Sequence, residues 1–206
     1  MLAKFTKCLS LKNDYIHLVN DASFVTFKEG KKLYIYFEWS NGVKDWINNF
    51  RFLALPIRPY KGMKSGVWFC HRGFQKVWKS IEPHLVEAIR DTSVEEIEIV
   101  GYSHGAAIAQ LCYEYVKYHR QDVTVTGVGF GSPRVVWGII SKTAKARFEG
   151  FTVIRNSKDI VTHLPPVVFG YRHIGKVIKI GKDSKGLIDD HKVSSYKESL
   201  KEYEAS

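Results

Sequence analysis

The fold of this chain is decided by the segment Ile97-Glu98-Ile99-Val100-Gly101-Tyr102-Ser103-His104-Gly105-Ala106-Ala107-Ile108-Ala109. Its apolar first half predicts a short buried strand, and the small residues of its second half predict a closely packed helix. The five residues between Val100 and Ala106 fit G-x-S-x-G, a sharp strand-to-helix turn that carries a nucleophilic serine. The competing interpretation is an ordinary turn with an incidental serine, but the flanking strand and helix favour the nucleophile turn.

Such a turn holds its serine in a strained backbone conformation, so glycines are needed where the strand and the helix cross. The Ser103 hydroxyl would stand at the carboxyl end of the strand, above the first turn of the helix. The backbone N–H of His104 would then point outward as a donor to an oxyanion, helped by the positive end of the helix.

A serine hydroxyl needs an imidazole to accept its proton and a carboxylate to orient that imidazole. In the order serine, acid, histidine, the acid is Asp159, directly after the predicted strand 151–156, and the base is His191, near the end of the chain. His163 is too close to the acid in sequence, and His173 stays open as a rival base. Five histidines precede the acid, against this order: His17, His71, His84, His104 and His119.

The second oxyanion donor should follow an earlier strand of the sheet. Ser40, after the predicted strand 33–37, is the candidate, and its alternative is an ordinary turn serine. Residues 41–66 follow no single period and are interrupted by proline and glycine, which is typical of a functional lid. This segment is both basic and apolar, and so suits an anionic lipid–water interface. A solvated loop packed on the core is the equally weighted alternative.

Alternating strands and helices in the middle of the chain predict a mostly parallel sheet with flanking helices, an α/β fold. A helix is expected over 74–89, where Pro83 should kink or divide it. The other expected elements are a hairpin of 23–27 and 33–37, strands at 67–70 and 123–132, a hairpin of 172–174 and 177–180, and a helix over 193–203.

The composition sets outer limits on function. The 206 residues are 45% hydrophobic and carry a formal net charge of +10, with a pI of about 9.4. These values predict one domain over residues 1–206 with a sizeable core. The charge permits attraction to nucleic acid, anionic membrane or anionic substrate, but no nucleic-acid-binding motif is present, so no nucleic-acid partner is expected.

The N-terminal residues 1–8 lack the apolar core of a signal peptide, and no apolar run is long enough to predict a membrane span. The three cysteines, Cys8, Cys70 and Cys112, cannot all pair and match no zinc pattern, which indicates thiols in a reducing compartment. A cytoplasmic location is therefore expected. The chemistry of the predicted site needs no metal or organic cofactor, and the oligomeric state is left open.

These motifs resemble those of the class 3 lipases, the family of the filamentous-fungal triacylglycerol lipases. The resemblance runs from about Phe24 to the C-terminus. Seven blocks stand in the family's order: Phe37-Glu38-Trp39-Ser40 with Asp45-Trp46; His71-Arg72-Gly73-Phe74; Gly101-Tyr102-Ser103-His104-Gly105-Ala106-Ala107; Phe130-Gly131-Ser132-Pro133-Arg134-Val135; Arg155-Asn156 with Asp159-Ile160-Val161 and Leu164-Pro165-Pro166; Gly170-Tyr171-Arg172-His173-Ile174-Gly175; and Asp190-His191 followed by Tyr196.

The resemblance implies an α/β-hydrolase fold and a carboxylic-ester hydrolase that works through an acyl-serine intermediate. It implies Ser103, Asp159 and His191 as the catalytic residues, with Ser40 and the His104 N–H as the oxyanion hole. It makes Asn41 to about Leu55 the lid, and it assigns His173 to a structural block.

The chain departs from the family pattern around the predicted site. Glu38-Trp39 replaces the family's Arg-Gly before the oxyanion residue, Tyr102 replaces a histidine, and His104 replaces an apolar residue. Lipid or small acyl esters are therefore the expected substrates, with phospholipid hydrolysis or acyl transfer by the same residues as alternatives. A third alternative is a catalytically inactive module that binds anionic lipid or nucleic acid.

Overall fold

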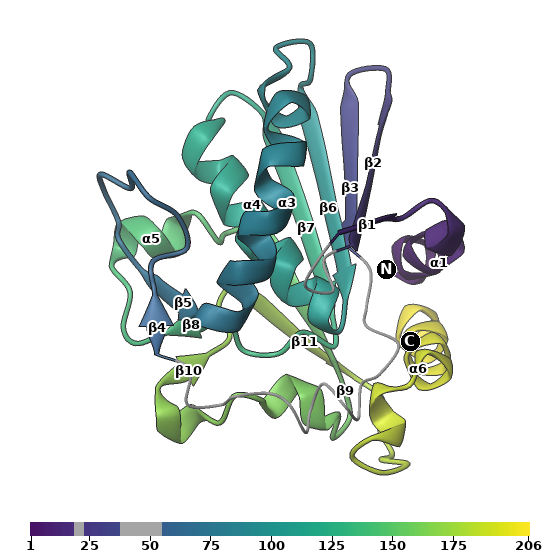
Figure 1. The fold of residues 1–206 in the computed structure, drawn as a ribbon. Helices are drawn as coiled ribbons and strands as arrows, with labels where there is room; N and C mark the ends of the chain where they lie inside the picture. Colours follow the sequence, from purple (N-terminus) through teal and green to yellow (C-terminus); the bar gives the residue numbers. More distant parts are fainter. Residues whose placement is uncertain (19–22, 38–54) are drawn as a thin grey trace.

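The computed structural model describes residues 1–18, 23–37 and 55–206. A seven-stranded sheet runs through the molecule (Figure 1). Its strands, in spatial order, are β1 (Ile16–His17), β2 (Ser23–Glu29), β3 (Lys32–Phe37), β6 (Glu96–Tyr102), β7 (Thr124–Phe130), β9 (Phe151–Asn156) and β11 (Lys176–Ile180). The last five are parallel, and β1 and β2 are antiparallel to their neighbours. The predicted mostly parallel sheet is confirmed.

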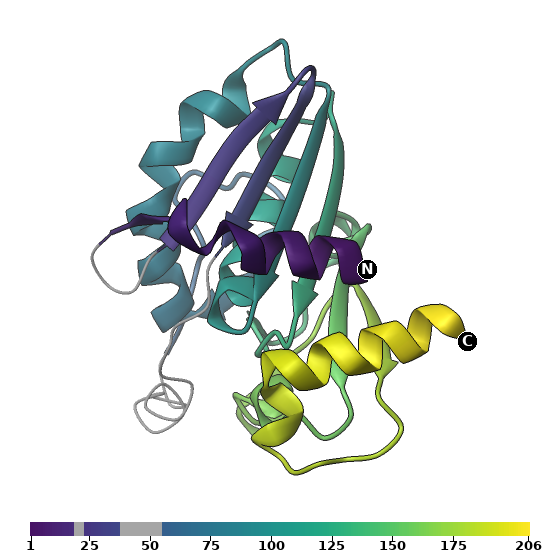
Figure 2. The ribbon, with the colours of Figure 1, turned by 90° about the vertical axis from the view of Figure 1, so that its right-hand side faces the viewer.

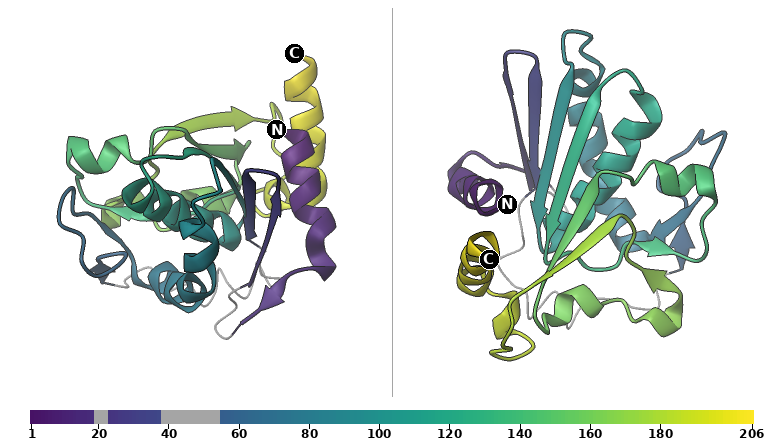
Figure 3. Two further views of the ribbon diagram at one scale, coloured as in Figure 1. Left: turned by 90° about the horizontal axis from the view of Figure 1, so that it is seen from above. Right: turned by 180° about the vertical axis from the view of Figure 1, so that it is seen from behind.

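Helices cover both faces of this sheet. Helices α3 (Arg72–Arg90) and α4 (His104–His119) pack on one face. On the other face, α1 (Leu2–Ser10) and α6 (Val193–Ala205) lie side by side (Figures 2 and 3). The remaining helical segments are short: α5 (Lys142–Ala146), η1 (Leu11–Asn13), η2 (Ile160–His163), η3 (Val167–Phe169) and η4 (Asp189–His191).

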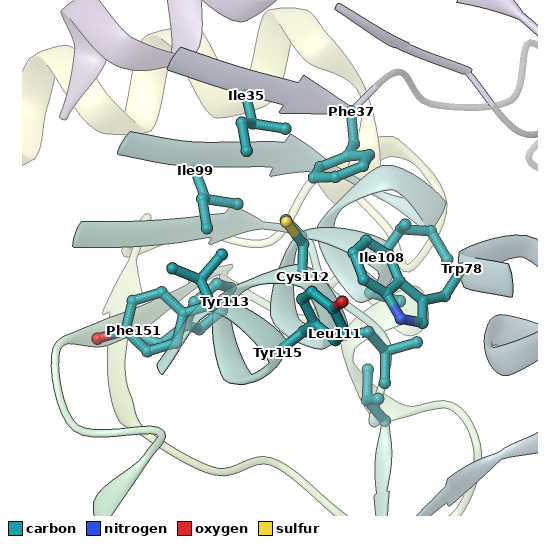
Figure 4. Close-up of a cluster of buried hydrophobic side chains, with 14 of the residues drawn as sticks. Ile35, Phe37, Trp78, Ile99, Ile108, Leu111, Cys112, Tyr113, Tyr115 and Phe151 are labelled. Carbon is teal, nitrogen blue, oxygen red and sulfur yellow. The ribbon is translucent and has the colours of Figure 1, made fainter. Parts of the chain in front are cut away.

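The core is divided between the two faces, because parallel central strands bury side chains on both sides. Beneath α3 and α4, sheet residues such as Ile35 and Ile99 meet Trp78, Leu111 and Phe151 (Figure 4). A second cluster under α1 and α6 contains Phe5, Tyr102, Phe130 and Tyr196. Both faces of the strands that lead to the predicted site are therefore packed against helices.

A smaller antiparallel sheet stands beside the main one, at the lower left of Figure 1. Its strands are β4 (Pro56–Ile57), β5 (Phe69–His71), β8 (Val136–Trp137) and β10 (Tyr171–Arg172), paired in the order β10-β8-β5-β4. Each strand has only two or three residues, so none is long enough to show the alternation of side chains by which strands are predicted.

The predicted hairpin of 172–174 and 177–180 is wrong. β10 pairs with β8 in the small sheet, whereas β11 pairs in parallel with β9 in the main sheet. Gly175 separates them with φ of 87°, and a Cβ there would stand 2.5 Å from the Phe151 carbonyl oxygen. A glycine between two short β-rich runs therefore marks a turn without specifying which strands pair.

Pro83 was expected to kink or divide its helix. It does not divide it, because α3 is one helix from Arg72 to Arg90, and the kink stays a prediction. Proline removes the hydrogen bond to the carbonyl four residues earlier, here that of Lys79. Both Pro83 and Lys79 are exposed, so water can satisfy that carbonyl. Helix α1 was not predicted at all, although its Phe5 ring packs 4.8 Å from the ring of Phe130.

His173 is a partly buried structural residue directly after β10. Its Nε2 donates to the Thr162 carbonyl of η2 over 2.8 Å, and within the described chain its Nδ1 is buried without a partner. Burial lowers the pKa of His173 to about 4, and the charges of Arg155 and Arg134 act in the same direction. The imidazole is therefore neutral and holds η2 against β10.

Replacement of Phe5 by alanine should lower the free energy of unfolding by about 3–5 kcal/mol, the usual cost of a cavity left by a buried phenylalanine. Phe5 is fully buried in the second cluster. Urea denaturation followed by circular dichroism measures the change. Thr6→Ala, at an exposed position of the same helix, is the matched control. An equal, small effect of both substitutions would contradict the packing of α1.

Replacement of His173 by glutamine should reduce the loss of stability in acid. The unfolded chain takes up a proton near the ordinary pKa of 6.5, but the folded chain does so only near 4. Stability from the neutral ring is therefore complete above pH 6.5 and is lost as the pH falls towards 4, at up to about 1.4 kcal/mol per pH unit. Urea titrations between pH 7 and 4 should show a shallower slope for the variant, with exposed His84→Gln as control. Identical slopes would contradict the burial of a neutral His173.

Candidate active site

The turn between β6 and α4 has the strained geometry that the sequence predicts. Ser103 has φ of 56° and ψ of −124°, in the region that L-residues rarely occupy. A Cβ at Gly101 would lie 2.3 Å from the Gly105 carbonyl oxygen, so only glycine permits the crossing. The Ser103 N–H donates to the Phe130 carbonyl over 2.8 Å. The serine is thus fastened to the neighbouring strand β7 at the carboxyl end of the sheet.

Three side chains from separate parts of the chain meet at this turn. Ser103 Oγ lies 2.8 Å from His191 Nε2, and His191 Nδ1 lies 2.8 Å from Asp159 Oδ2. All three are at most 2% exposed. Because an ionised carboxylate only accepts hydrogen bonds, Nδ1 carries the proton and Nε2 is left to accept from the serine. This arrangement can deprotonate the Ser103 hydroxyl.

Asp159 is held by further donors. The Val161 N–H donates to its Oδ1 over 2.9 Å, and the Tyr196 hydroxyl donates to its Oδ2 over 2.7 Å. Burial and the adjacent Asp159 carboxylate raise the pKa of Tyr196 well above its ordinary value, so the phenol stays a donor. Tyr196 comes from α6, and this contact therefore connects the C-terminal helix to the site.

The imidazole of His191 is fixed on its ring faces and edges. The Tyr102 ring stacks on it at 5.2 Å between centroids, with an angle of 16° between the planes. The Tyr102 hydroxyl also donates to the His191 backbone carbonyl. At Gly131, which has φ of 60°, a Cβ would lie 2.9 Å from the imidazole Cε1. Sequence reasoning missed the roles of Tyr102 and Gly131, although both lie in the motif blocks.

The loop that carries His191 is tied down by its neighbour Asp190. The Asp190 carboxylate accepts from Ser184 Oγ at 2.6 Å and from the backbone N–H groups of Lys185 and Lys158 at 2.8 Å and 3.1 Å. Although burial raises the pKa of Asp190, these hydrogen bonds outweigh it and lower the pKa below its ordinary value. Asn156 Nδ2 also donates to the Asp190 carbonyl over 2.8 Å. The adjacency of Asp190 to His191 was the only sequence signal of this role.

Of the two predicted oxyanion donors, the described residues include His104. His104 is the first residue of α4, and the first N–H groups of a helix have no partner within it. Its side chain is buried with its ring 5.6 Å from that of Phe74. Ser40 and residues 41–54 of the predicted lid lie outside the described residues. The oxyanion hole of Ser40 and His104 stays a prediction.

The rival histidines serve other contacts. His173 bonds to Thr162, as described above, and His163 Nδ1 lies 2.8 Å from the Asp159 backbone carbonyl oxygen. Across residues 1–18, 23–37 and 55–206, no group of three histidine, cysteine, aspartate or glutamate side chains is arranged to hold a metal ion. Cys8, Cys70 and Cys112 are buried free thiols, and burial raises the pKa of Cys70 and Cys112, so both stay protonated.

Solved lipase structures share this architecture. A triacylglycerol lipase whose catalytic centre is described as a serine protease triad superposes with a TM-score of 0.67 at 20% identity, over 85% of this chain and 76% of that one. A fungal lipase solved in complex with an inhibitor gives a TM-score of 0.65 at 25% identity, over 81% and 66% of the two chains. The predicted α/β-hydrolase fold is confirmed.

The curated relatives of this chain include fungal lipases. A lipase of Rhizomucor miehei is 26% identical over 153 residues, which cover 71% of this chain and 41% of that protein. The secreted mono- and diacylglycerol lipase 1 of Fusarium solani is 26% identical over 171 residues, or 81% and 49% of the two chains. The chain thus spans less than half the length of these two relatives.

The expected cytoplasmic location is contradicted by these relatives. Besides the Fusarium solani enzyme, a lipase of Malassezia globosa that is 34% identical over 106 residues is described as secreted. The expectation rested partly on unpaired cysteines. Buried thiols are shielded from oxidants in any compartment, so they do not indicate in which compartment the protein resides. Within the described residues, no helix combines the length and apolar character that crossing a membrane requires.

The family assignment rests on most of the chain. The family model described as "Lipase (class 3)" matches residues 34–169, a span that begins in β3 and ends in η3. It includes the serine turn and Asp159. This chain belongs to the class 3 lipase family.

Proposed function

We propose that this protein is a serine carboxylic-ester hydrolase that cleaves lipid esters through an acyl-serine intermediate. The observation that carries the proposal is the unbroken pair of 2.8 Å contacts from Ser103 through His191 to Asp159. A nucleophile, a base and an orienting acid in hydrogen-bond contact are the parts that acyl transfer requires.

In the first half of the proposed reaction, Ser103 Oγ attacks the ester carbonyl carbon while His191 Nε2 accepts the hydroxyl proton. Asp159 stabilises the imidazolium that forms, and the charge on the carbonyl oxygen is met by the His104 N–H and by Ser40 as the second donor. As the carbon–oxygen bond of the ester breaks, Nε2 gives its proton to the leaving alcohol, and the acyl group remains on Ser103.

In the second half, water replaces the alcohol. His191 Nε2 accepts a proton from that water as its oxygen attacks the acyl carbon, and it returns the proton to Ser103 Oγ when the fatty acid leaves. The same residues would transfer the acyl group to another alcohol if one entered in place of water.

Lipid esters are the proposed substrates because similar proteins are described as lipases. The Fusarium solani and Malassezia globosa proteins are described as mono- and diacylglycerol lipases. For the substrate surface we retain the proposal of an anionic lipid–water interface, since the segment 41–66 carries basic and apolar residues without a balancing number of acids.

We also propose that residues 1–206 form one domain and that a lid lies within 41–66. The described end of this segment is anchored. The Tyr60 hydroxyl donates to buried Glu114 over 2.9 Å, and Arg147 Nη2 donates to the Gly66 carbonyl over 2.6 Å. Any movement would therefore be confined to the residues before Tyr60.

Ser103→Ala should lower hydrolysis of aryl esters and acylglycerols by about three orders of magnitude or more, because the variant lacks the nucleophile. Initial rates on a panel of aryl esters, triacylglycerols and phospholipids measure the loss and also identify the preferred ester. Ser80→Ala on the outer part of α3 is the control, since Ser80 Oγ bonds only within its own helix. A Ser103→Ala protein that keeps its activity would refute the proposed mechanism.

Tyr196→Phe should lower kcat by about tenfold to a hundredfold with little change in KM, because the variant removes one hydrogen bond to the charged Asp159. Steady-state kinetics on a soluble aryl ester separate the two constants. Tyr203→Phe, at an exposed position of the same helix, is the matched control. An unchanged kcat would show that the phenol does not assist Asp159.

A further inference from the structure

A small cavity lies between helices α3 and α4 and the loop that follows β4. The two helices lie side by side (Figure 1), and the loop adds two residues to the lining. The volume of the cavity is about 280 Å³. This is close to the lower bound of about 300 Å³ for small-molecule sites, so only a small ligand fits. The lining residues are Tyr60, Lys61, Lys79, Glu82, Tyr115 and His119.

This cavity is separate from the candidate active site. Ser103 directly precedes α4, whereas Tyr115 and His119 belong to the last turns of the same helix. At about 1.5 Å of rise per residue, this helix of 16 residues puts roughly 20 Å between the two places. A ligand of the cavity would therefore not touch an ester bound at Ser103.

Three rings form one wall of the cavity. The ring of Tyr60 meets that of Tyr115 edge to face at 5.3 Å, and the ring of His119 lies 4.3 Å from that of Tyr115. Burial lowers the pKa of His119, and the charge of Arg90 acts in the same direction, so the imidazole is neutral at pH 7. The wall can therefore attract a cation through its π electrons and adds no positive charge of its own.

The carboxylate of Glu82 lines the same cavity from α3. Glu82 is partly buried, and it forms no ion pair with another residue of the described chain. Burial raises the pKa of Glu82, and the Tyr115 hydroxyl and the charge of Lys79 only partly offset this effect. The carboxylate has therefore lost part of its water without gaining a cation. A carboxylate in this state beside aromatic rings suits an organic ammonium ion.

Two lysines supply the opposite charge. Lys61 and Lys79 line the cavity, have exposed side chains and form no ion pair within the part of the chain that the structure describes. Lysine binds phosphate groups as a point charge. The lining thus carries one negative and two positive charges. A ligand with one cationic group and one phosphate monoester, which has a charge of about −2, would balance all three.

The loop that carries Tyr60 and Lys61 is already fixed without a ligand. The Tyr60 hydroxyl donates to buried Glu114, and the Lys64 N–H donates to the Tyr118 hydroxyl over 2.8 Å. Both acceptors belong to α4. Binding therefore needs little ordering of the loop, which lowers its entropic cost.

We infer that this cavity is a binding site for a soluble phosphate monoester that carries a quaternary ammonium group, with phosphocholine as the simplest example. The ammonium group would lie against the aromatic wall beside Glu82, and Lys61 and Lys79 would hold the phosphate. The headgroup of a phosphatidylcholine bilayer fits less well, because its phosphate is a diester with a single negative charge. Binding at this site does not require the proposed hydrolysis.

Isothermal titration calorimetry tests the ligand class. Wild-type protein is titrated with phosphocholine, with choline and with inorganic phosphate. Phosphocholine should bind at least tenfold more tightly than either of the other two, because only it meets both kinds of group, and its binding should weaken as salt is raised. Equal binding of choline, equal binding of inorganic phosphate, or no binding of phosphocholine would each overturn the inference.

Variants of the lining test the place. Glu82→Gln and Lys61→Gln should each weaken phosphocholine binding at least tenfold. Glu87→Gln and Lys76→Gln, at exposed positions of α3, are the matched controls and should have no effect. Equal losses in the controls would overturn the assignment to this cavity.

The exposed ring of His119 allows a test of the aromatic wall. His119→Phe keeps a ring at this position and should keep phosphocholine binding, whereas His119→Ala should weaken it several-fold. Equal binding by the two variants would contradict the contribution of the ring.

Two further measurements separate the possible outcomes. In the Ser103→Ala background, Glu82→Gln should not change cosedimentation with phosphatidylcholine vesicles. A loss of vesicle binding would show that the cavity holds a lipid headgroup and would overturn the soluble ligand. Hydrolysis of a soluble aryl ester by wild-type protein reports the proposed function separately. Absent hydrolysis with intact phosphocholine binding would refute the proposed function alone, and the reverse result would refute this site alone.

Discussion

The close crossing of β6 and α4 is the constraint on which the rest of the structure depends. At Gly101 the two backbones approach so closely that no side chain fits, and Ser103 is held at φ of 56° as a result. Such a conformation persists only where the surroundings over-determine it. Here the pairing of β6 between β3 and β7, and the burial of α4 against the sheet, supply that support.

The same end of the sheet gathers the groups that the serine needs. Asp159 follows β9, and His191 arrives on a loop held by Asp190 and by α6. Tyr102 connects the serine turn to the histidine loop, because it directly precedes Ser103 and its ring stacks on the imidazole of His191. The contacts that stabilise the fold are therefore also the contacts that orient the proposed base.

Sequence reasoning predicted the geometry where a local pattern carries a local meaning. The glycines, the serine and the order of acid and base predicted the turn at Ser103 and the three side chains that the structure brings together there, and their catalytic roles stay a proposal. Sequence reasoning failed where a strand pairs with another strand that is far away in the sequence. Two-residue strands of the small sheet carry no periodicity, and the run after Gly175 joins β9 and forms no hairpin. Helix α1 was missed although Leu2, Phe5 and Leu9 recur at helical spacing within its nine residues. The roles proposed for Ser40 and the lid stay predictions.

Covalent labelling tests most directly whether Ser103 is an activated nucleophile. Folded wild-type protein is treated with a fluorophosphonate, and the modified peptide is identified by mass spectrometry. We expect a single adduct on Ser103 Oγ, which should not form after unfolding in urea because the imidazole is then no longer adjacent. The absence of an adduct on the folded protein, or an adduct on another serine, would contradict this expectation.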